Sequence, residues 1–238
     1  MQRFITDRDI KDGFWYYRPK ECFPPSSIRN PADYIGLPTV SIACTQTGLP
    51  AHQQTKLVKE WCKILPTCRG LKFVWFQTQL PQNLFDAACQ IPDLEGLWIK
   101  WSSVKEITNI VKLTNLKFLR VGSSPQILKI DSLKNLKNLV WLELENIKKV
   151  SNLTVIGEMT QLQGLELGGS MWSRQIVDSL APLANLKSLR YLSLPNLKAK
   201  DKTLSHLFTL SSLEQFNAAI WWDKNEIKQL RMRNPKLN

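Results

Sequence analysis

The sequence lacks long apolar runs and the common catalytic motifs. No stretch of its 238 residues approaches the ~18–20 consecutive apolar residues that cross a membrane, and the first nine residues hold no apolar segment typical of a signal peptide. Phosphate-loop, nucleophile-elbow, zinc-protease and dinucleotide-binding motifs are absent as well. We therefore expect a soluble, cytoplasmic protein that is not an enzyme and needs no cofactor.

Histidines are few, and cysteines are not paired in the sequence. The two histidines, His52 and His206, stand far apart in the chain. The five cysteines are Cys22, Cys44, Cys62, Cys68 and Cys89, an odd number without a C-x-x-C pair. This pattern favours free, mostly buried thiols in a reducing compartment. No metal site is expected, because zinc ligands come in closely spaced pairs.

The charge balance is basic but dispersed. Thirty-two lysines and arginines against twenty aspartates and glutamates give a net charge of +12. A basic nucleic-acid or anionic-surface binding protein is therefore an alternative. The positive excess forms no stripe along the chain, however, and a hydrophobic content of 43% indicates a folded core rather than a solvated basic tail.

What the sequence does contain is a repeat. Apolar residues recur as L-x-x-L-x-x-L-x-L in seven units, whose third apolar positions are Leu71, Leu97, Leu119, Leu142, Leu165, Leu192 and Phe216. Successive positions are 22 to 27 residues apart. One such unit is common by chance, but seven in near-constant phase indicate a repeat architecture.

These units resemble the leucine-rich repeat family, with short repeats of the bacterial kind, over residues 65–221. The resemblance implies an α/β solenoid with a curved, parallel concave sheet of about 7–8 strands and an irregular or short helical convex side. One departure concerns the turn after each strand, where the family usually has Asn or Cys. This chain has serine or apolar residues at those positions, so we expect serines to replace part of the ladder and the apolar residues to pack.

The chain is expected to form one continuous domain in three parts. Residues 1–64 form an N-terminal cap that includes a degenerate β–α unit, with a strand at 39–44 and a helix at 53–65. Residues 65–221 hold the seven repeats, and residues 222–238 close the solenoid. On the convex side, the apolar spacing in residues 174–186 and 203–210 predicts short helices.

The alternation of the strands predicts which side chains face a partner. The leucines of each L-x-L point inward, so the residues beside and between them form rows on the concave face. These rows carry the aromatic residues Trp98, Phe118, Trp141 and Tyr191. Large aromatics are frequent anchors of interfaces, but these could instead pack on one another or under the cap. The tryptophans at 75, 101, 172, 221 and 222 follow strands and are expected to pack at the edge.

Charged residues occupy the same rows. Arg120 precedes Glu143, Glu145 and Glu166, and Glu143 and Glu166 are expected on adjacent strands about 4.8 Å apart. Like charges in that position destabilise a sheet. The carboxylates could form a socket for a lysine or arginine of a partner, or a solvated pair with Arg120. A hydrolase that uses them is a third possibility, and its turnover would be abolished by Glu166→Gln.

The leading hypothesis from these features is a monomeric, non-enzymatic protein-interaction module. Its partner protein would contact Trp98, Phe118, Arg120, Trp141, Glu143, Glu145, Glu166 and Tyr191 on the concave face. Inhibitor, adaptor and toxin-neutralising immunity proteins are possible roles. The partner itself is unknown, and binding to a membrane is not expected.

Overall fold

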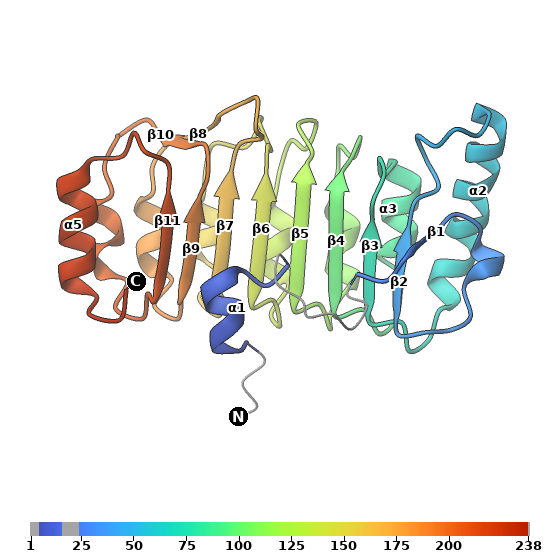
Figure 1. Ribbon diagram of the computed structural model, residues 1–238, viewed down its shortest axis with the longest axis horizontal. Coiled ribbons are helices and arrows are strands. Elements are labelled where there is room, and N and C mark those ends of the chain that lie inside the picture. Colours follow the sequence, from blue (N-terminus) through green and yellow to red (C-terminus); the bar gives the residue numbers. More distant parts are fainter. Residues whose placement is uncertain (1–4, 16–23, 238) are drawn as a thin grey trace.

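Parallel strands stacked in chain order form the body of the molecule (Figure 1). The computed structural model describes residues 5–15 and 24–237. A nine-stranded sheet has the order β1-β2-β3-β4-β5-β6-β7-β9-β11. Its strands are β1 (Ser27–Ile28), β2 (Thr39–Ile42), β3 (Phe73–Phe76), β4 (Gly96–Trp101), β5 (Phe118–Ser123), β6 (Trp141–Glu145), β7 (Gly164–Gly168), β9 (Tyr191–Leu194) and β11 (Gln215–Ala218). The expected α/β solenoid is confirmed, and the two-residue β1 takes the sheet to nine strands.

Helices and 3₁₀ turns return the chain from one strand to the next. The α-helices are α1 (Asp7–Asp12), α2 (Ala51–Ile64), α3 (Gln82–Ala88), α4 (Thr154–Gly157) and α5 (Lys224–Arg233). The 3₁₀ helices are Pro31–Asp33, Leu65–Thr67, Thr108–Lys112, Asp131–Asn135, Ala181–Asn185 and Ser205–Thr209. Of the helices in the described residues, all but α1 lie beside or behind the sheet in Figure 1, and α1 lies on the opposite, concave face.

The core forms because each repeat buries its leucines against its neighbours. Leu97, Leu119, Leu142, Leu165 and Leu192 are Cα partners on successive strands and are fully buried. A single unit cannot bury such a row, whereas stacked units bury it continuously. The large main cluster of buried residues runs from Val40 to Leu237.

The first repeat differs from the expected alignment by three residues. Val74, not Leu71, is the Cα partner of Leu97. The apolar pattern in this region also fits Cys68, Leu71, Val74 and Phe76, because a spacing of three recurs within each unit. As a consequence Trp75, which was expected in a turn at the edge, pairs with Trp98 in the central row of the concave face.

The prediction of a helix over residues 174–186 was wrong at its start. Residues Gln175–Val177 form β8, which pairs in parallel with β10 (Leu197–Ala199) in a separate two-stranded sheet. Only Ala181–Asn185 is helical. It is a 3₁₀ turn with Pro182 near its N-terminus. A proline lacks the N–H that a longer helix would need in its interior.

Serines and asparagines supply the turn bonds that the family's usual ladder would make. Ser102 and Ser124 are linked through their Oγ atoms at 2.6 Å. Asn146 lies one residue before Ile147, which occupies the position where the family usually has Asn or Cys, and it adopts a φ of 54°. Its Nδ2 donates to Ser123 Oγ at 2.7 Å and its Oδ1 accepts from Ser173 Oγ at 2.9 Å, so it joins three turns.

The N-terminal region contains the expected strand and helix, as β2 and α2. Residues 1–64 were predicted to form an N-terminal cap, with packing of the concave aromatics under it as one of the alternatives. Within them, residues 5–15 form α1 and a turn that lie across the concave face, in front of the later strands in Figure 1. Residues 16–23, which include Tyr16, Tyr17 and Cys22, are outside the described part. None of the described helices is long and apolar enough to cross a membrane.

Candidate functional site

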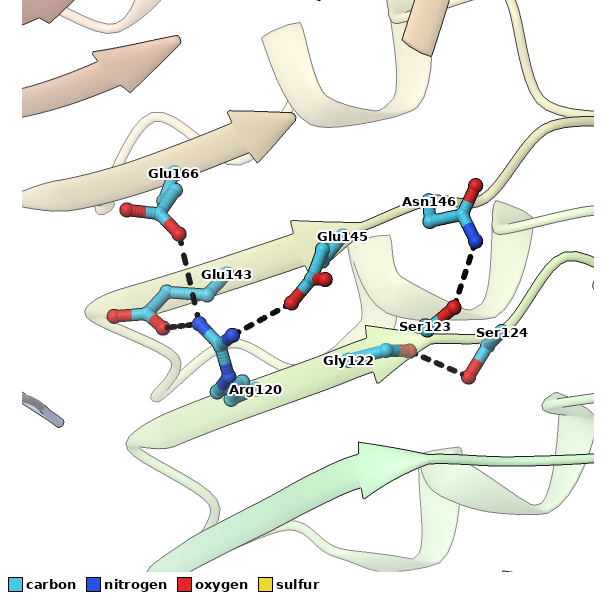
Figure 2. Close-up of polar contacts among 8 residues, drawn as sticks. All are labelled: Arg120, Gly122, Ser123, Ser124, Glu143, Glu145, Asn146 and Glu166. Carbon is cyan, nitrogen blue, oxygen red and sulfur yellow. Dashed lines mark hydrogen bonds and ion pairs between the residues drawn. The ribbon is translucent and has the colours of Figure 1, made fainter. Parts of the chain in front are cut away.

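The centre of the concave face is a cluster of charged side chains from three adjacent strands. The Cα register places Arg120 of β5 beside Glu143 of β6, and Glu143 beside Glu166 of β7, as the repeat spacing predicted. Figure 2 shows the Arg120 guanidinium between Glu143, Glu145 and Glu166. We call these four residues the charge cluster.

Arg120 bonds to all three carboxylates. Its Nη1 lies 2.5 Å from Glu143 Oε2 and 3.5 Å from Glu166 Oε1, and its Nη2 lies 2.7 Å from Glu145 Oε2. Trp141 Nε1 donates to the other oxygen of Glu143 at 2.9 Å. Of the two alternatives from the sequence, the pairing with Arg120 is the one present in this structure, but it is buried rather than solvated.

Burial makes this cluster electrostatically costly. Glu143 is 1% exposed, and this burial raises the pKa of its carboxyl to about 7, with Arg120 opposing the rise and Glu166 adding to it. Burial also raises the pKa of the Glu145 carboxyl. Desolvation is the main cause in both cases, because an ionised carboxylate loses its hydration. Three carboxylates around one guanidinium leave the cluster with an excess of negative groups.

Stability should therefore depend on pH through Glu143. Its folded-state pKa of about 7 lies above its ordinary value of 4.5, so between these pH values the folded chain binds more protons than the unfolded chain. The contribution of Glu143 to the free energy of unfolding should then rise as the pH falls from about 7 toward about 4.5. We expect Glu143→Gln to flatten this part of the profile, measured by urea unfolding from pH 5 to pH 8. Parallel profiles for the two proteins would contradict the assignment.

Residues 5–15 cover the aromatic side chains beside the charge cluster. We call Phe118, Trp141 and Tyr191 the aromatic row. Phe14 stacks on Phe118 with ring centroids 3.7 Å apart and planes inclined by 5°. Trp15 meets Trp75 edge to face at 6.0 Å. With Ile5 and Ile10, these side chains form a second buried cluster that includes Trp141 and Tyr191.

The local sequence explains why this segment forms a helical turn. Thr6 caps α1 by accepting from the Asp9 backbone N–H at 3.2 Å, while Asp9 Oδ2 accepts from the Thr6 backbone N–H at 2.9 Å. Such a capping box satisfies two free donors at the helix start. Gly13 ends the helix at a φ of 83°, which glycine adopts without strain, and directs the two following aromatic residues onto the sheet. Asp7 also forms an ion pair with Arg190, at 3.1 Å.

The structure therefore brings all eight predicted contact residues to one face, but most are covered. Phe118, Trp141 and Tyr191 are buried, as are Arg120, Glu143 and Glu166. Trp98 and Glu145 are half-buried, and the Arg120 guanidinium lies 5.9 Å from the Trp98 ring centroid. Contact of these eight residues with a partner stays a prediction, and for Phe118, Trp141 and Tyr191 it requires residues 5–15 to move away.

The tryptophans expected to pack at the edge behave differently from one another. Trp222 and Trp75 are buried, whereas Trp172 is 90% exposed and Trp221 is 43% exposed. Sequence periodicity placed all five after strands and could not separate them, although Trp75 lies within β3 and Trp101 is the last residue of β4. Exposure of a side chain this large is a signal that only the three-dimensional structure provides.

The described residues offer no evident metal centre or reactive thiol. No group of three His, Cys, Asp or Glu side chains is placed to hold a metal ion within residues 5–15 and 24–237. Cys44, Cys62, Cys68 and Cys89 are free. Burial raises the pKa of the Cys44 thiol to about 12 and also raises that of Cys89, and a thiol that stays protonated is a poor nucleophile.

Comparison with known proteins gives structural matches only. No protein-family model and no curated protein matches this sequence. An internalin C2 from Listeria monocytogenes is similar in structure, with 22% identity, a TM-score of 0.56, and coverage of 71% of this chain and 69% of the internalin chain. A leucine-rich repeat protein from Leptospira interrogans has 18% identity and a TM-score of 0.59 over 90% of this chain. The match spans about half, 51%, of the Leptospira chain.

Proposed function

We propose that this chain, which has the leucine-rich repeat fold, is a non-enzymatic module that binds a partner protein on its concave face. The observation that carries the proposal is that the concave face binds residues 5–15 of its own chain. The concave face holds a short helical segment through stacked aromatic rings and one ion pair at its margin. A surface that holds such a segment of its own chain has the shape and chemistry to hold one from a partner.

Residues 5–15, the covering segment, are suited to replacement by a segment of a partner. Helix α1 has six residues, and a helix this short is not stable without tertiary contacts. It donates no strand to the sheet, and its apolar residues form a cluster separate from the main core. Its displacement would therefore leave the repeats and their leucine core in place.

A partner that replaces it would contact the residues predicted from the sequence. Phe118, Trp141 and Tyr191 would become available, with Trp98 and the charge cluster beside them. Aromatic anchors in a desolvated centre commonly contribute about 2 kcal/mol or more each to binding. The excess of carboxylates in the cluster would favour a partner segment that combines an aromatic residue with a lysine or arginine. Inhibitor, adaptor and immunity roles would all use this surface.

Releasing the segment should expose a binding site for it. In the full chain, Phe14→Asp with Trp15→Asp places two charges that cannot be buried on the aromatic row. We expect this double variant to bind a labelled peptide of residues 1–18 saturably, by fluorescence polarisation. The unaltered chain should bind it at least about tenfold more weakly, because its tethered segment competes at a millimolar effective concentration.

Two controls make this test specific. The same peptide with both aromatic residues changed to aspartate should not bind. A single-stranded oligonucleotide, titrated with salt, tests the alternative of nucleic-acid binding, for which affinity would fall steeply as salt rises. If the double variant fails to bind the unaltered peptide, the concave face does not recognise such segments in trans and the proposal is wrong.

A further inference from the structure

A second surface, at the edge of the solenoid, exposes large apolar side chains near cations that form no ion pair with any described residue. We define the edge patch as Met171, Trp172, Arg174, Lys198, Lys202, Ile220 and Trp221. Met171 is 85%, Trp172 90% and Ile220 93% exposed. These residues lie on β10 and on the loops that follow β7, β10 and β11, near one end of the sheet in Figure 1.

The basic part of the edge patch surrounds a pocket. The pocket has a volume of about 310 Å³ and is lined by Arg174, Lys198, Ala199, Lys202, Trp221 and Trp222. The Arg174 guanidinium lies over the Trp221 ring, 4.5 Å from its centroid, and Trp221 Nε1 donates to the Leu197 carbonyl at 3.1 Å. These contacts hold Trp221 and Arg174 in place before any ligand arrives.

The pocket wall also contains a hydrogen-bond donor in need of an acceptor. Trp222 is 4% exposed, and its Nε1–H has no hydrogen-bond partner among the described residues. A buried donor without a partner destabilises the fold, because it has lost its hydrogen bonds to water and gained none in return. Trp222 lines the pocket, so a ligand oxygen that reaches its Nε1–H would relieve that cost.

No carboxylate of the described residues neutralises the three cations of the patch. The nearest acidic groups in the sequence have other partners: Asp178 pairs with Lys200 at 2.7 Å, Asp201 lies 3.2 Å from His206, and Asp223 accepts two backbone N–H groups at the start of α5. The pocket therefore presents positive charge beside exposed apolar surface.

We propose that the edge patch binds an acidic segment of a partner protein that also carries apolar side chains. Its carboxylates would enter the pocket and pair with Arg174, Lys198 and Lys202, while its apolar side chains cover Met171, Trp172 and Ile220. A protein segment suits the patch better than a nucleic acid does. Trp172 is the one fully exposed ring of the patch, whereas Met171 and Ile220 offer no ring for bases to stack on and the guanidinium of Arg174 already covers a face of Trp221.

This surface is independent of the concave face. Its residues lie on loops and on the two-stranded β8–β10 sheet, and none belongs to the aromatic cluster that residues 5–15 cover. Failure of one proposal therefore leaves the other standing. A partner that engaged both surfaces would gain from two linked contacts.

The test uses the full chain and a short fluorescein-labelled peptide rich in glutamate, leucine and phenylalanine. We expect saturable binding by fluorescence polarisation. Trp172→Ala and Lys198→Glu should each weaken it at least tenfold. Lys59→Glu is the matched control, since Lys59 is an exposed lysine of α2, at the opposite end of the solenoid in Figure 1, and it should leave the affinity unchanged. Thermal unfolding of each variant checks that the fold is retained.

Three further ligands test which class of molecule binds the edge patch. A peptide with serines in place of its apolar residues should bind more weakly, and a lysine-for-glutamate peptide should not bind. Tighter binding of single-stranded oligothymidine than of the acidic peptide would assign the patch to nucleic acid instead. Dimers in sedimentation that Trp172→Ala abolishes would assign it to a second copy of the chain. Absence of saturable peptide binding, or equal binding by Lys198→Glu, would also overturn the proposal.

Discussion

Replacing Arg120 with methionine should be among the most destabilising single changes in this protein. We expect a loss of about 3–5 kcal/mol in the free energy of unfolding near pH 8, the cost of leaving buried charges without their partner. Arg120 contacts Glu143, Glu145 and Glu166, and the variant would leave these carboxylates side by side. Urea unfolding, with the slope compared to exclude a change in the unfolded state, measures the effect.

The dependence of this loss on pH identifies its cause. Without the guanidinium the folded-state pKa values of Glu143 and Glu145 should rise further, so protonation relieves the repulsion as the pH falls. The loss should therefore be smaller near pH 5 than near pH 8. A second substitution, Glu143→Gln, should recover part of it at pH 8. Lys134→Met, which breaks a half-exposed ion pair with Glu158 at 3.7 Å, should cost only about 0–1 kcal/mol.

A loss that is the same at every pH, or that Glu143→Gln does not reduce, would indicate a packing role for the arginine stem instead. The long methionine side chain retains much of that packing. The comparison therefore separates the charge of Arg120 from its volume.

Trp141→Ala should produce an effect of similar size for a different reason. Truncation of a large, fully buried aromatic side chain costs about 3–5 kcal/mol, and Trp141 is 0% exposed. Its ring lies against Tyr191, with centroids 4.9 Å apart. It also lies so close to Gly164 that a Cβ there would come within 2.0 Å of a ring atom. The variant also removes the hydrogen bond to Glu143.

Two other substitutions serve as comparisons for Trp141→Ala. Trp172→Ala removes the same side chain from an exposed position, so it should change the stability by no more than about 0.5 kcal/mol. Trp141→Phe retains a ring and loses the N–H, so its cost should lie between the two. Chemical denaturation followed by circular dichroism measures all three. Equal effects of Trp141→Ala and Trp172→Ala would contradict the buried placement of Trp141.

The expected destabilisation by Trp141→Ala changes how a loss of partner binding in that variant should be interpreted. If Trp141→Ala abolishes binding of a partner, destabilisation alone could account for it. Trp98 is half-buried and outside the segment's closest stacking contacts, so Trp98→Ala is the more informative change at the concave face.

The repeat spacing alone was enough to predict the order of side chains across the sheet. Buried leucines two residues apart leave only the residue between them to face the other way, and parallel strands stack equivalent positions. Trp98, Arg120, Glu143 and Glu166 therefore fall in one row, as expected. The same reasoning failed in the first repeat, because apolar residues spaced by three fit two alignments and only strand pairing chooses Val74 over Leu71.

The sequence by itself determined the solenoid, because a periodic apolar pattern can be buried only by stacking its units. It also determined which residues share the concave face from β4 onward. Tertiary structure decided what covers that face and which tryptophans remain exposed. Phe14 meets Phe118 although they are far apart in the chain, and such a contact leaves no periodic trace in the sequence. Likewise Trp172 and Trp222 both follow strands, and only packing against neighbouring loops exposes one and buries the other.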